Sequence, residues 1–467
     1  MQGRLLNLCA DRPSQSFTSR IMDMISDSSH TGKRLAPSGS SFDCFPDEVI
    51  GIILSHMPCV RDVVMASVTC HKWQEAAWNY LYRLNFIESD FVSRGTVMTR
   101  ISREAIISKV VMKTKSLREL SICMYRTVSI QAVPLITWLD FTKKSLTSLT
   151  LENGIQPNLN LLDSLGGGQS KLKCFKWESP YIRTIDSIRH SFQSLVSLSL
   201  VRPSCTLSPK NLQELLCICP SLASLRLEDT HIYYQADATC QMKSCSLKAL
   251  SLHGGFEGID HVVLFMECLD LLTVEGVTFQ SLKLVQERQS CLQNLTIEHA
   301  NVAAWDLGES VNSLRTFNLN QGDDLAKEWP RYYQLISTVR TLQKLQLSGR
   351  MLTIHEGVNL NEIAGAFPEL SQLAVNYEHA PRAFMACNSA YFKKLVILKL
   401  SANTINEPFA LWIAQFLNRC ASLKRLKIAG EVCEAKTRYM KSLCMFNAAI
   451  IDIMRSYPHV KVSFDFY

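Results

Sequence analysis

The sequence lacks any run of about 18 consecutive apolar residues, the length that a membrane-spanning helix needs, so no transmembrane segment or membrane partner is expected. It is also poor in charge, because Asp, Glu, Lys and Arg make up only 19% of its 467 residues, against roughly 25% in an average soluble chain. A net charge of +7 is too small to predict nucleic-acid binding. Hydrophobic residues make up 47%, which excludes global disorder.

The motifs of common catalytic and metal sites are missing as well. The 17 cysteines form no Cys-x-x-Cys pair and the 11 histidines do not pair at metal-ligand spacing. The glycine-rich segment 166–171 lacks the spacing and the Lys-Ser/Thr ending of a phosphate-binding loop, and no Gly-x-Ser-x-Gly occurs. We therefore expect a non-catalytic protein without cofactor or metal. Scattered, reduced cysteines favour an intracellular location, in the nucleus, the cytoplasm or both.

The first 41 residues differ from the rest of the chain. They combine Ser, Thr, Gly, Pro and charged residues without hydrophobic periodicity, which predicts a disordered N-terminal tail. Three arginines among the serines also suggest a transit peptide, but Asp11, Asp23 and Asp27 are unusual in such peptides.

Residues 42–85 have the pattern of three short helices. The first places Val49, Ile50 and Leu54 on one helical stripe and ends before Pro58. Asp62 is the predicted N-cap of the second helix, and Trp73 belongs to the third. So few residues make a small core, and we expect the module to depend on a partner or on the rest of its own chain.

From residue 117 onward one pattern, Leu-x-x-Leu-x-Leu, recurs thirteen times with occasional apolar replacements. Successive copies start at intervals that fall within the range of leucine-rich repeats, which stack as a solenoid. The first position of each copy is Leu117, Leu146, Leu172, Leu195, Leu222, Leu247, Leu269, Leu292, Leu314, Leu342, Leu370, Leu395 and Leu423.

These patterns predict an α/β chain in which each repeat is a short strand followed by a backing segment. Helical patterns occupy 209–217 and 408–418, whereas the shortest intervals leave room only for a turn. A helix around 446–454 and a strand at 460–466 are expected to cap the last repeat. The predicted order is a tail (1–41), a helical module (42–85), a connecting helical segment (86–116) and a repeat domain with its cap (117–467).

The helical module resembles an F-box. The segment Phe45-Pro-Asp-Glu-Val-Ile-Gly-Ile-Ile-Leu-Ser-His-Met-Pro58 is followed by Arg61-Asp62 and by Val68-Thr-Cys-His-Lys-Trp73, in the order of the family pattern. Phe45 stands where leucine is usual. Together with the repeats, this resembles the F-box/leucine-rich-repeat class, and its plant members in particular.

The resemblance implies the substrate-recognition subunit of an SCF-type ubiquitin ligase. The F-box would dock on a Skp-family adaptor, and through it on a cullin and a RING protein, while the repeats would capture an unknown protein substrate. Of the adaptor-facing positions, we expect Pro46, Ile50 and Leu54 to be exposed anchors. The positions implied are Phe45, Pro46, Val49, Ile50, Ile53, Leu54, Val63, Val64, Val68 and Trp73.

Two other functions remain open. One is a receptor gated by a small molecule, as in plant hormone-sensing members of the class, which carry a basic pocket for an inositol phosphate. The other is a binding scaffold outside any ligase. The strand positions expected on the concave face include only four basic residues, Lys176, Arg226, Lys399 and Lys427, so the polyphosphate pocket ranks second.

A row of glutamates follows the strands of the front repeats at Glu152, Glu178, Glu228, Glu275 and Glu298. Equivalent positions in neighbouring repeats lie roughly 5 Å apart, so like charges there repel unless a positive group meets them. The row is either a solvated rim or a surface for a basic segment of the substrate. Lys399, Arg425 and Lys427 in the rear repeats favour acidic or phosphorylated residues instead.

Overall fold

The computed structural model describes residues 45–466 with gaps at 94–95, 98, 125–128, 153, 160, 167–169, 179–189, 203–206, 230–238, 257, 288–290, 323–324, 350–359, 378–390, 403–404 and 431–436. The tail predicted for 1–41 lies outside the described residues. The described chain is α/β, with parallel strands backed by helices, as predicted. It divides into two compact units, residues 1–207 with 217–222 and residues 208–216 with 223–467.

Three short helices open the first unit: α2 (Asp47–Ser55), α3 (Val60–Ser67) and α4 (His71–Tyr80). The N-cap of α3 is Cys59, so the predicted N-cap, Asp62, instead lies in the first turn. Gly51 allows α2 to approach α4 closely, because a Cβ at that position would lie 2.5 Å from the Cβ of Tyr80. The packing of these two helices therefore requires that residue 51 has no side chain.

The three helices lead directly into a parallel ladder of short strands. β1 (Arg83–Ile87) pairs with β4 (Glu119–Cys123), with Leu84 beside Leu120. β1 was not predicted, and the expected module boundary at residue 85 falls inside it. The ladder continues through β6 (Ser148–Leu151), β8 (Cys174–Glu178) and β9 (Ser197–Val201). The remaining elements are η2 (Glu88–Phe91), β2 (Val92–Ser93), β3 (Thr96–Val97), α5 (Arg100–Lys113), β5 (Ile130–Gln131), α6 (Ala132–Thr142), β7 (Ile155–Gln156) and α7 (Leu161–Leu165).

The second unit carries a longer ladder of the same kind. Each of the thirteen Leu-x-Leu segments predicted in the chain is a strand, and residues alternate between a buried and a more exposed side. The leucines face the buried side, which makes the core of the repeats. The strands of this unit are β10 (Ser224–Glu228), β12 (Ala249–His253), β14 (Leu271–Glu275), β16 (Asn294–Glu298), β18 (Thr316–Asn320), β19 (Lys344–Ser348), β20 (Gln372–Tyr377), β21 (Ile397–Ala402), β22 (Arg425–Gly430) and β23 (Lys461–Phe466).

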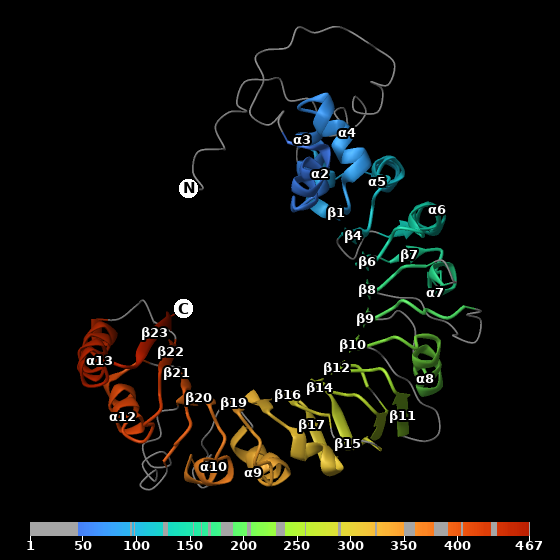
Figure 1. Cartoon of the computed structure of the whole chain (residues 1–467). Helices are drawn as coiled ribbons and strands as arrows, with labels where there is room; N and C mark the ends of the chain where they lie inside the picture. Colours follow the sequence, from blue (N-terminus) through green and yellow to red (C-terminus); the bar gives the residue numbers. More distant parts are fainter. Residues whose placement is uncertain are drawn as a thin grey trace. The chain divides into compact units, whose positions relative to one another are not determined.

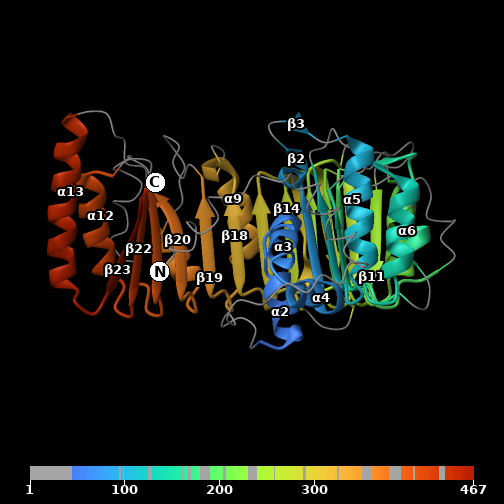
Figure 2. The same ribbon diagram turned by 90° about the horizontal axis from the view of Figure 1, so that it is seen from above.

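Helices of the second unit back one face of its ladder, as Figure 1 shows for α9, α10 and α12. Helices at both segments with a helical pattern, and the helix and strand expected after the last repeat, are all present. Figure 2 shows α13 lying beyond α12 at the end of this unit. None of the described helices is long and apolar enough to cross a membrane. Their bounds are α8 (Pro209–Ile218), η3 (Gly308–Ser313), α9 (Leu325–Ile336), α10 (Leu360–Ala366), α12 (Glu407–Leu417) and α13 (Thr437–Ser456).

The short repeats are backed by a second parallel sheet and not by the turns that their length suggested. A strand rises about 3.3 Å per residue, against 1.5 Å in a helix. Six extended residues therefore span about 20 Å, which a helix would need about thirteen residues to cover. The shortest intervals accommodate such a strand. The sheet consists of β11 (Thr239–Ser244), β13 (His261–Met266), β15 (Thr278–Val285) and β17 (Asn301–Asp306), in that order.

Residues with positive φ follow several strands of the second unit. Asp229, Gly254, Gly276 and His299 have φ between 47° and 60° and lie directly after β10, β12, β14 and β16. The N–H of each donates to the last carbonyl of the next strand, as from Gly254 to Glu275 at 2.8 Å. The turn that ends one strand is therefore fixed by the backbone of its neighbour.

Candidate functional site

The expected adaptor-facing residues divide into a buried and an exposed set. Ile50 and Leu54 are fully buried, so the expectation that they are exposed anchors is wrong. The reason is that their stripe faces the other helices of the module, since α2 packs mainly against α4. Val63 and Val64 are buried on α3. Val49 and Trp73 are half-buried, while the exposed members of the set are Phe45, Pro46, Ile53 and Val68.

Two further exposed apolar residues on α2 and α3 were missed. Ile52 is 49% exposed and Met65 is 38% exposed. Ile52 lies in the apolar run 49–54 but off the buried stripe, which was the available signal. Single exposed apolar side chains are common on any protein. Several on two short neighbouring helices form the kind of surface that binds another protein.

A buried polar contact joins α3 to the chain after β1. Asp90 is fully buried, and its carboxylate accepts hydrogen bonds from the backbone N–H groups of Ile87 at 2.9 Å and Arg61 at 3.2 Å. The Arg61 guanidinium donates to the carbonyl oxygens of Asp90 and Val92. Burial raises the pKa of the Asp90 carboxyl above its ordinary value. Burial also raises the pKa of the nearby Cys59 thiol to about 11, so this thiol stays protonated at neutral pH.

Two more hydrogen bonds attach the helices to β1. The Ser55 hydroxyl accepts from the N–H of Tyr82 at 3.0 Å, and the Asn85 amide donates to the carbonyl of Pro58 at 2.6 Å. The N–H of Lys115 donates to the carbonyl of Trp78 at 2.9 Å, which adds a contact from the chain before β4. Because three short helices make a small core, these contacts explain how the module is stabilised by the repeats that follow it.

Most of the glutamate row is already paired with cations of the chain itself. In the first unit Glu152 lies 2.5 Å from Lys176 Nζ, and Glu178 lies 2.5 Å from Arg202. The hydrogen bond to Glu152 raises the pKa of Lys176. Glu178 is buried and the other glutamates of the row are half-buried. These partners, which the sequence reasoning missed, lie one repeat further along the chain.

In the second unit two glutamates of the row are also paired, but with partners on their own strand or on the preceding strand. Glu228 pairs with Arg226 of its own strand at 2.8 Å, and Glu275 lies 2.5 Å from Nδ1 of His253 on the preceding strand. Glu298 also ends its strand. Arg226 thus offsets the charge of Glu228, and the His253 ring contacts Glu275, so groups of the chain itself reduce the repulsion that the row would otherwise create. The solvated-rim interpretation gains support, while the role of the row in binding stays a prediction.

The rear repeats place their basic residues together. Lys399 is aligned with Lys427 across β21 and β22, and Arg425 is aligned with Lys461 across β22 and β23. Asp465 pairs with Lys427 at 2.6 Å. On the face away from the core these three strands therefore carry four cations and one carboxylate. Aligned residues on neighbouring strands lie about 5 Å apart, so the cations form one basic patch.

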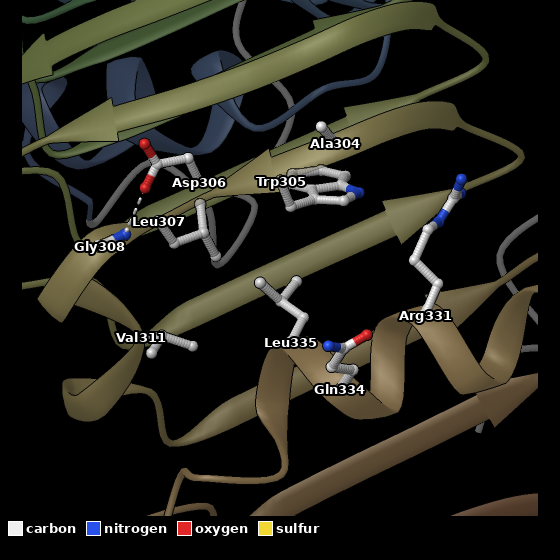
Figure 3. A pocket seen from close by; sticks show the side chains of 9 residues that line it. All are labelled: Ala304, Trp305, Asp306, Leu307, Gly308, Val311, Arg331, Gln334 and Leu335. Carbon is white, nitrogen blue, oxygen red and sulfur yellow. Dashed lines mark hydrogen bonds between the residues drawn. The ribbon is translucent and has the colours of Figure 1, made fainter.

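A cavity of about 450 Å³ lies on the backing side of the second unit, between β17, η3 and α9 (Figure 3). Trp305, Leu307 and Leu335 give it apolar walls, and Arg331 lies at one end (Figure 3). Arg331 is bound to Glu328 at 2.5 Å, and Asp306 accepts from the N–H of Gly308 and pairs with Lys283. The charged side chains of this cavity are thus paired within the chain, and no ligand class follows from them.

Metal binding finds no support among the described residues, and two buried cysteines are poorly reactive. Nowhere in them do three His, Cys, Asp or Glu side chains group as metal ligands would. Burial raises the pKa of the Cys219 and Cys240 thiols to about 12, which suppresses their reactivity. Segment 166–171 lies partly outside the described residues.

Comparison with known proteins finds an extended similarity. No protein-family model matches the chain. An F-box/LRR-repeat protein from Arabidopsis thaliana is 30% identical over 430 residues, which cover 91% of this chain and 100% of the relative. The similarity thus includes both the three-helix module and the repeats.

Proposed function

The chain belongs to the F-box/LRR-repeat family, and we propose that it is the substrate-recognition subunit of an SCF-type ubiquitin ligase. In this role the three-helix module docks on a Skp-family adaptor, which links it to a cullin and a RING protein. The repeats capture a protein for ubiquitination, in the nucleus, the cytoplasm or both. The chain itself carries out no chemistry. The observation that carries the proposal is the set of exposed apolar side chains on α2 and α3, beside a core that is already complete without them.

Adaptor docking would use the exposed residues and not the buried stripe. Ile52, Ile53, Met65 and Val68 are each between 37% and 49% exposed. Burying apolar area contributes about 25 cal/mol per Å², and a few well-packed side chains dominate the energy of most interfaces. The buried Ile50 and Leu54 would then act indirectly, by holding α2 in place.

Co-expression with a Skp-type adaptor tests this assignment. Ile53→Asp should reduce adaptor recovery at least tenfold, because it places a charge in the apolar contact. The matched control is Ile101→Asp on α5, where the side chain is 76% exposed and lies outside the module. The control should recover the adaptor like the parent chain. If Ile53→Asp and Val68→Asp both recovered as much adaptor as the parent chain, docking through this surface would be refuted.

Two simpler variants would not distinguish a loss of adaptor docking from a loss of folding. Leu54→Asp buries a charge in the module core, so a loss of binding would follow from unfolding alone. Deleting residues 42–82 removes the partners of Asp90 and of Asn85 in β1 as well as the docking surface. Substitutions at exposed positions keep these contacts and leave folding measurable.

For the substrate, we infer an acidic or phosphorylated segment bound at the basic patch of β21–β23. Four cations against one carboxylate leave a net positive surface, and charge-assisted hydrogen bonds to carboxylate or phosphate are strong. Lys399→Glu with Arg425→Glu should abolish capture of such a substrate and leave adaptor recovery unchanged. Lys393→Glu with Lys394→Glu, just before β21, is the charge-matched control. Capture that is unaffected by the first pair, or equally affected by both pairs, would contradict this assignment.

A small-molecule-gated receptor remains the alternative. A polyphosphate site needs several free cations together, but Lys176 and Arg226, two of the four expected on the strand face, are paired with glutamates. This pairing favours protein capture over an inositol phosphate pocket. Isothermal calorimetry of the full chain with inositol hexakisphosphate distinguishes the two, since micromolar binding would support the alternative.

A further inference from the structure

Helices α5 and α6 pack side by side on the backing face of the first unit (Figure 1, Figure 2). The Trp138 indole of α6 donates to the Ser108 hydroxyl of α5 at 2.8 Å. One turn earlier on α5, the Glu104 carboxylate accepts from the N–H of Gln131, which precedes α6, at 2.7 Å. The two helices therefore run in the same direction and are held together at two places, so a surface to which both contribute is fixed in shape.

Large apolar side chains lie exposed at both ends of this helix pair. Near the start of the helices, Ile101 is 76% and Val133 is 72% exposed, and no other large apolar side chain of the described residues is as exposed as these two. Near the end of the helices, Met112 is 41% and Phe141 is 45% exposed. Single exposed apolar residues are common on any protein. Four of them on two neighbouring helices indicate a surface that another molecule covers.

The exposed residues follow the spacing of a helix. On α5, positions 101, 105, 108 and 112 lie on one stripe, and on α6 positions 133, 137 and 141 recur every four residues. Because Ser108 on the first stripe contacts α6, that stripe borders the second helix. The stripe from Ile101 to Met112 is about 16 Å long, or three turns, at 1.5 Å per residue. We call this surface the α5–α6 face, and its residues are Ile101, Ala105, Ser108, Met112, Val133, Thr137 and Phe141.

Small side chains make up the middle of the α5–α6 face. Ala105, Ser108 and Thr137 lie between the two apolar ends. The hydroxyls of Ser108 and Thr137 donate to the carbonyls of Glu104 and Val133 on their own helices, so their donors are already satisfied. A partner helix can therefore approach the middle closely while its apolar side chains reach the two ends. Helices that are recognised by a protein surface carry their anchors at this kind of spacing.

The charges beside the α5–α6 face are mostly positive. The two helices contain two carboxylates, and of these Glu104 is buried and hydrogen-bonded while Asp140 is exposed. Burial lowers the pKa of Lys113, and the neighbouring charge of Lys109 lowers it further. A negatively charged partner would relieve this repulsion and offset the excess of positive charge. The cations that are not buried are Arg100, Lys109 and Lys113 of α5, with Lys143 and Lys144 directly after α6.

We propose that the α5–α6 face binds an amphipathic helix of a partner protein, with apolar anchors at both ends of the face and an acidic polar side. The site uses no residue of α2, α3 or β21–β23, so it is separate from the two surfaces assigned above. An anionic lipid surface is also attracted to cations beside apolar residues. The three-turn length and the exposed Asp140 favour a protein helix over such a surface.

Binding of a designed peptide to the full-length chain tests this proposal. The probe is a fluorescein-labelled helical peptide of about 16 residues, with leucines spaced to match the α5 stripe and only glutamate and alanine elsewhere. In the comparison peptide every glutamate is replaced by lysine. Fluorescence anisotropy should give a Kd of about 50 μM or tighter for the acidic peptide and binding at least tenfold weaker for the basic one. Added salt should weaken binding of the acidic peptide.

Substitutions at the most exposed end of the α5–α6 face give the second measurement. Ile101→Asp and Val133→Asp should each weaken binding of the acidic peptide at least tenfold, because each places a carboxylate in the apolar contact and near the acidic partner. Leu411→Asp on α12, at a side chain that is 55% exposed, is the matched control and should bind like the parent chain. Circular dichroism verifies that each variant is folded, and adaptor recovery should not change.

Three results would overturn the proposal. The first is that the parent chain binds the two peptides equally or binds neither. The second is that Ile101→Asp and Val133→Asp bind the acidic peptide as the parent chain does. The third is that these variants lose a dimer seen by analytical ultracentrifugation, or lose binding to vesicles of phosphatidylserine and phosphatidylcholine, while the acidic peptide does not bind. A second copy or a membrane would then be the occupant.

Discussion

Among single residues, Asp90 illustrates how a side chain links the helical module to the repeats. Its carboxylate accepts from the backbone N–H groups of Ile87 and Arg61. Leaving a buried donor unsatisfied costs about 1–3 kcal/mol. We therefore expect Asp90→Ala to lower the free energy of unfolding by about 2 kcal/mol or more, as measured by urea denaturation.

Asp452→Ala is the matched control at this scale. Asp452 is 74% exposed on α13, and its carboxylate pairs with the similarly exposed Arg455 at 3.3 Å. Exposed ion pairs contribute about 0–1 kcal/mol, so this variant should unfold like the parent chain. Similar losses from both substitutions would show that Asp90 is not a specific link.

The burial of individual side chains was the feature that the sequence predicted least well. The helical stripe of Ile50 and Leu54 was recognisable from its spacing, but spacing does not tell whether a stripe faces a partner or the chain's own helices. The partners of the glutamates were equally hard to predict from the sequence. Arg202 lies in the next repeat and His253 in the preceding one, so their pairing depends on how the strands align.

Among the elements, the crossing of α2 and α4 depends on Gly51. An added methyl group would lie 2.5 Å from the Tyr80 Cβ and close to its backbone, which cannot move aside easily. Overpacking of this kind costs about 1–3 kcal/mol. Gly51→Ala should therefore raise hydrogen exchange across residues 47–80 and reduce adaptor recovery in parallel.

Gly365→Ala in α10 provides the comparison, because a Cβ there meets nothing within 4 Å. Alanine is favoured over glycine in a helix by about 1 kcal/mol, so this variant should melt no lower than the parent chain. A Gly51→Ala chain with unchanged exchange across α2 and α4 would mean that the helices can separate without cost.

Elements were predictable where a pattern repeated and unpredictable where it changed. Thirteen strands followed from the regular Leu-x-Leu spacing. β1 was missed although Leu81, Leu84 and Phe86 fit the pattern, because Leu81 lies further from Leu117 than any two successive copies lie from each other. The second sheet was missed because a short interval specifies that no helix fits, but not that a strand such as β13 replaces it.

At the scale of the whole molecule, each stacked repeat is stabilised by its neighbours. Removing structure at one end should therefore destabilise mainly the adjacent repeats. Removing residues 460–466 uncovers one edge of β22 and the buried Leu426 and Ile428. At about 25 cal/mol per Å² of exposed apolar area, the loss amounts to several kcal/mol. The truncated chain should melt at a lower temperature and lose hydrogen-exchange protection first in β20–β22.

Phe464→Ala is the milder variant for this prediction. It keeps the strand and its hydrogen bonds but removes a side chain that is already 43% exposed, so the melting temperature should fall less. Strands β4 to β9 of the first unit should keep their protection in both variants. A truncation that melts like the parent chain, or that weakens β4 as much as β22, would contradict the local capping role.

The left-handed turns after β10, β12, β14 and β16 also bear on how such a chain can evolve. Each turn donates its N–H to a backbone carbonyl of the next strand, and the same bond recurs at successive joins. Deleting or duplicating one repeat in the gene therefore brings together a donor and an acceptor that already match. Unequal recombination could then lengthen or shorten the array by whole repeats without new compensating mutations. Homologues are expected to differ in length by steps of about one repeat, with new binding specificities arising on the added strands.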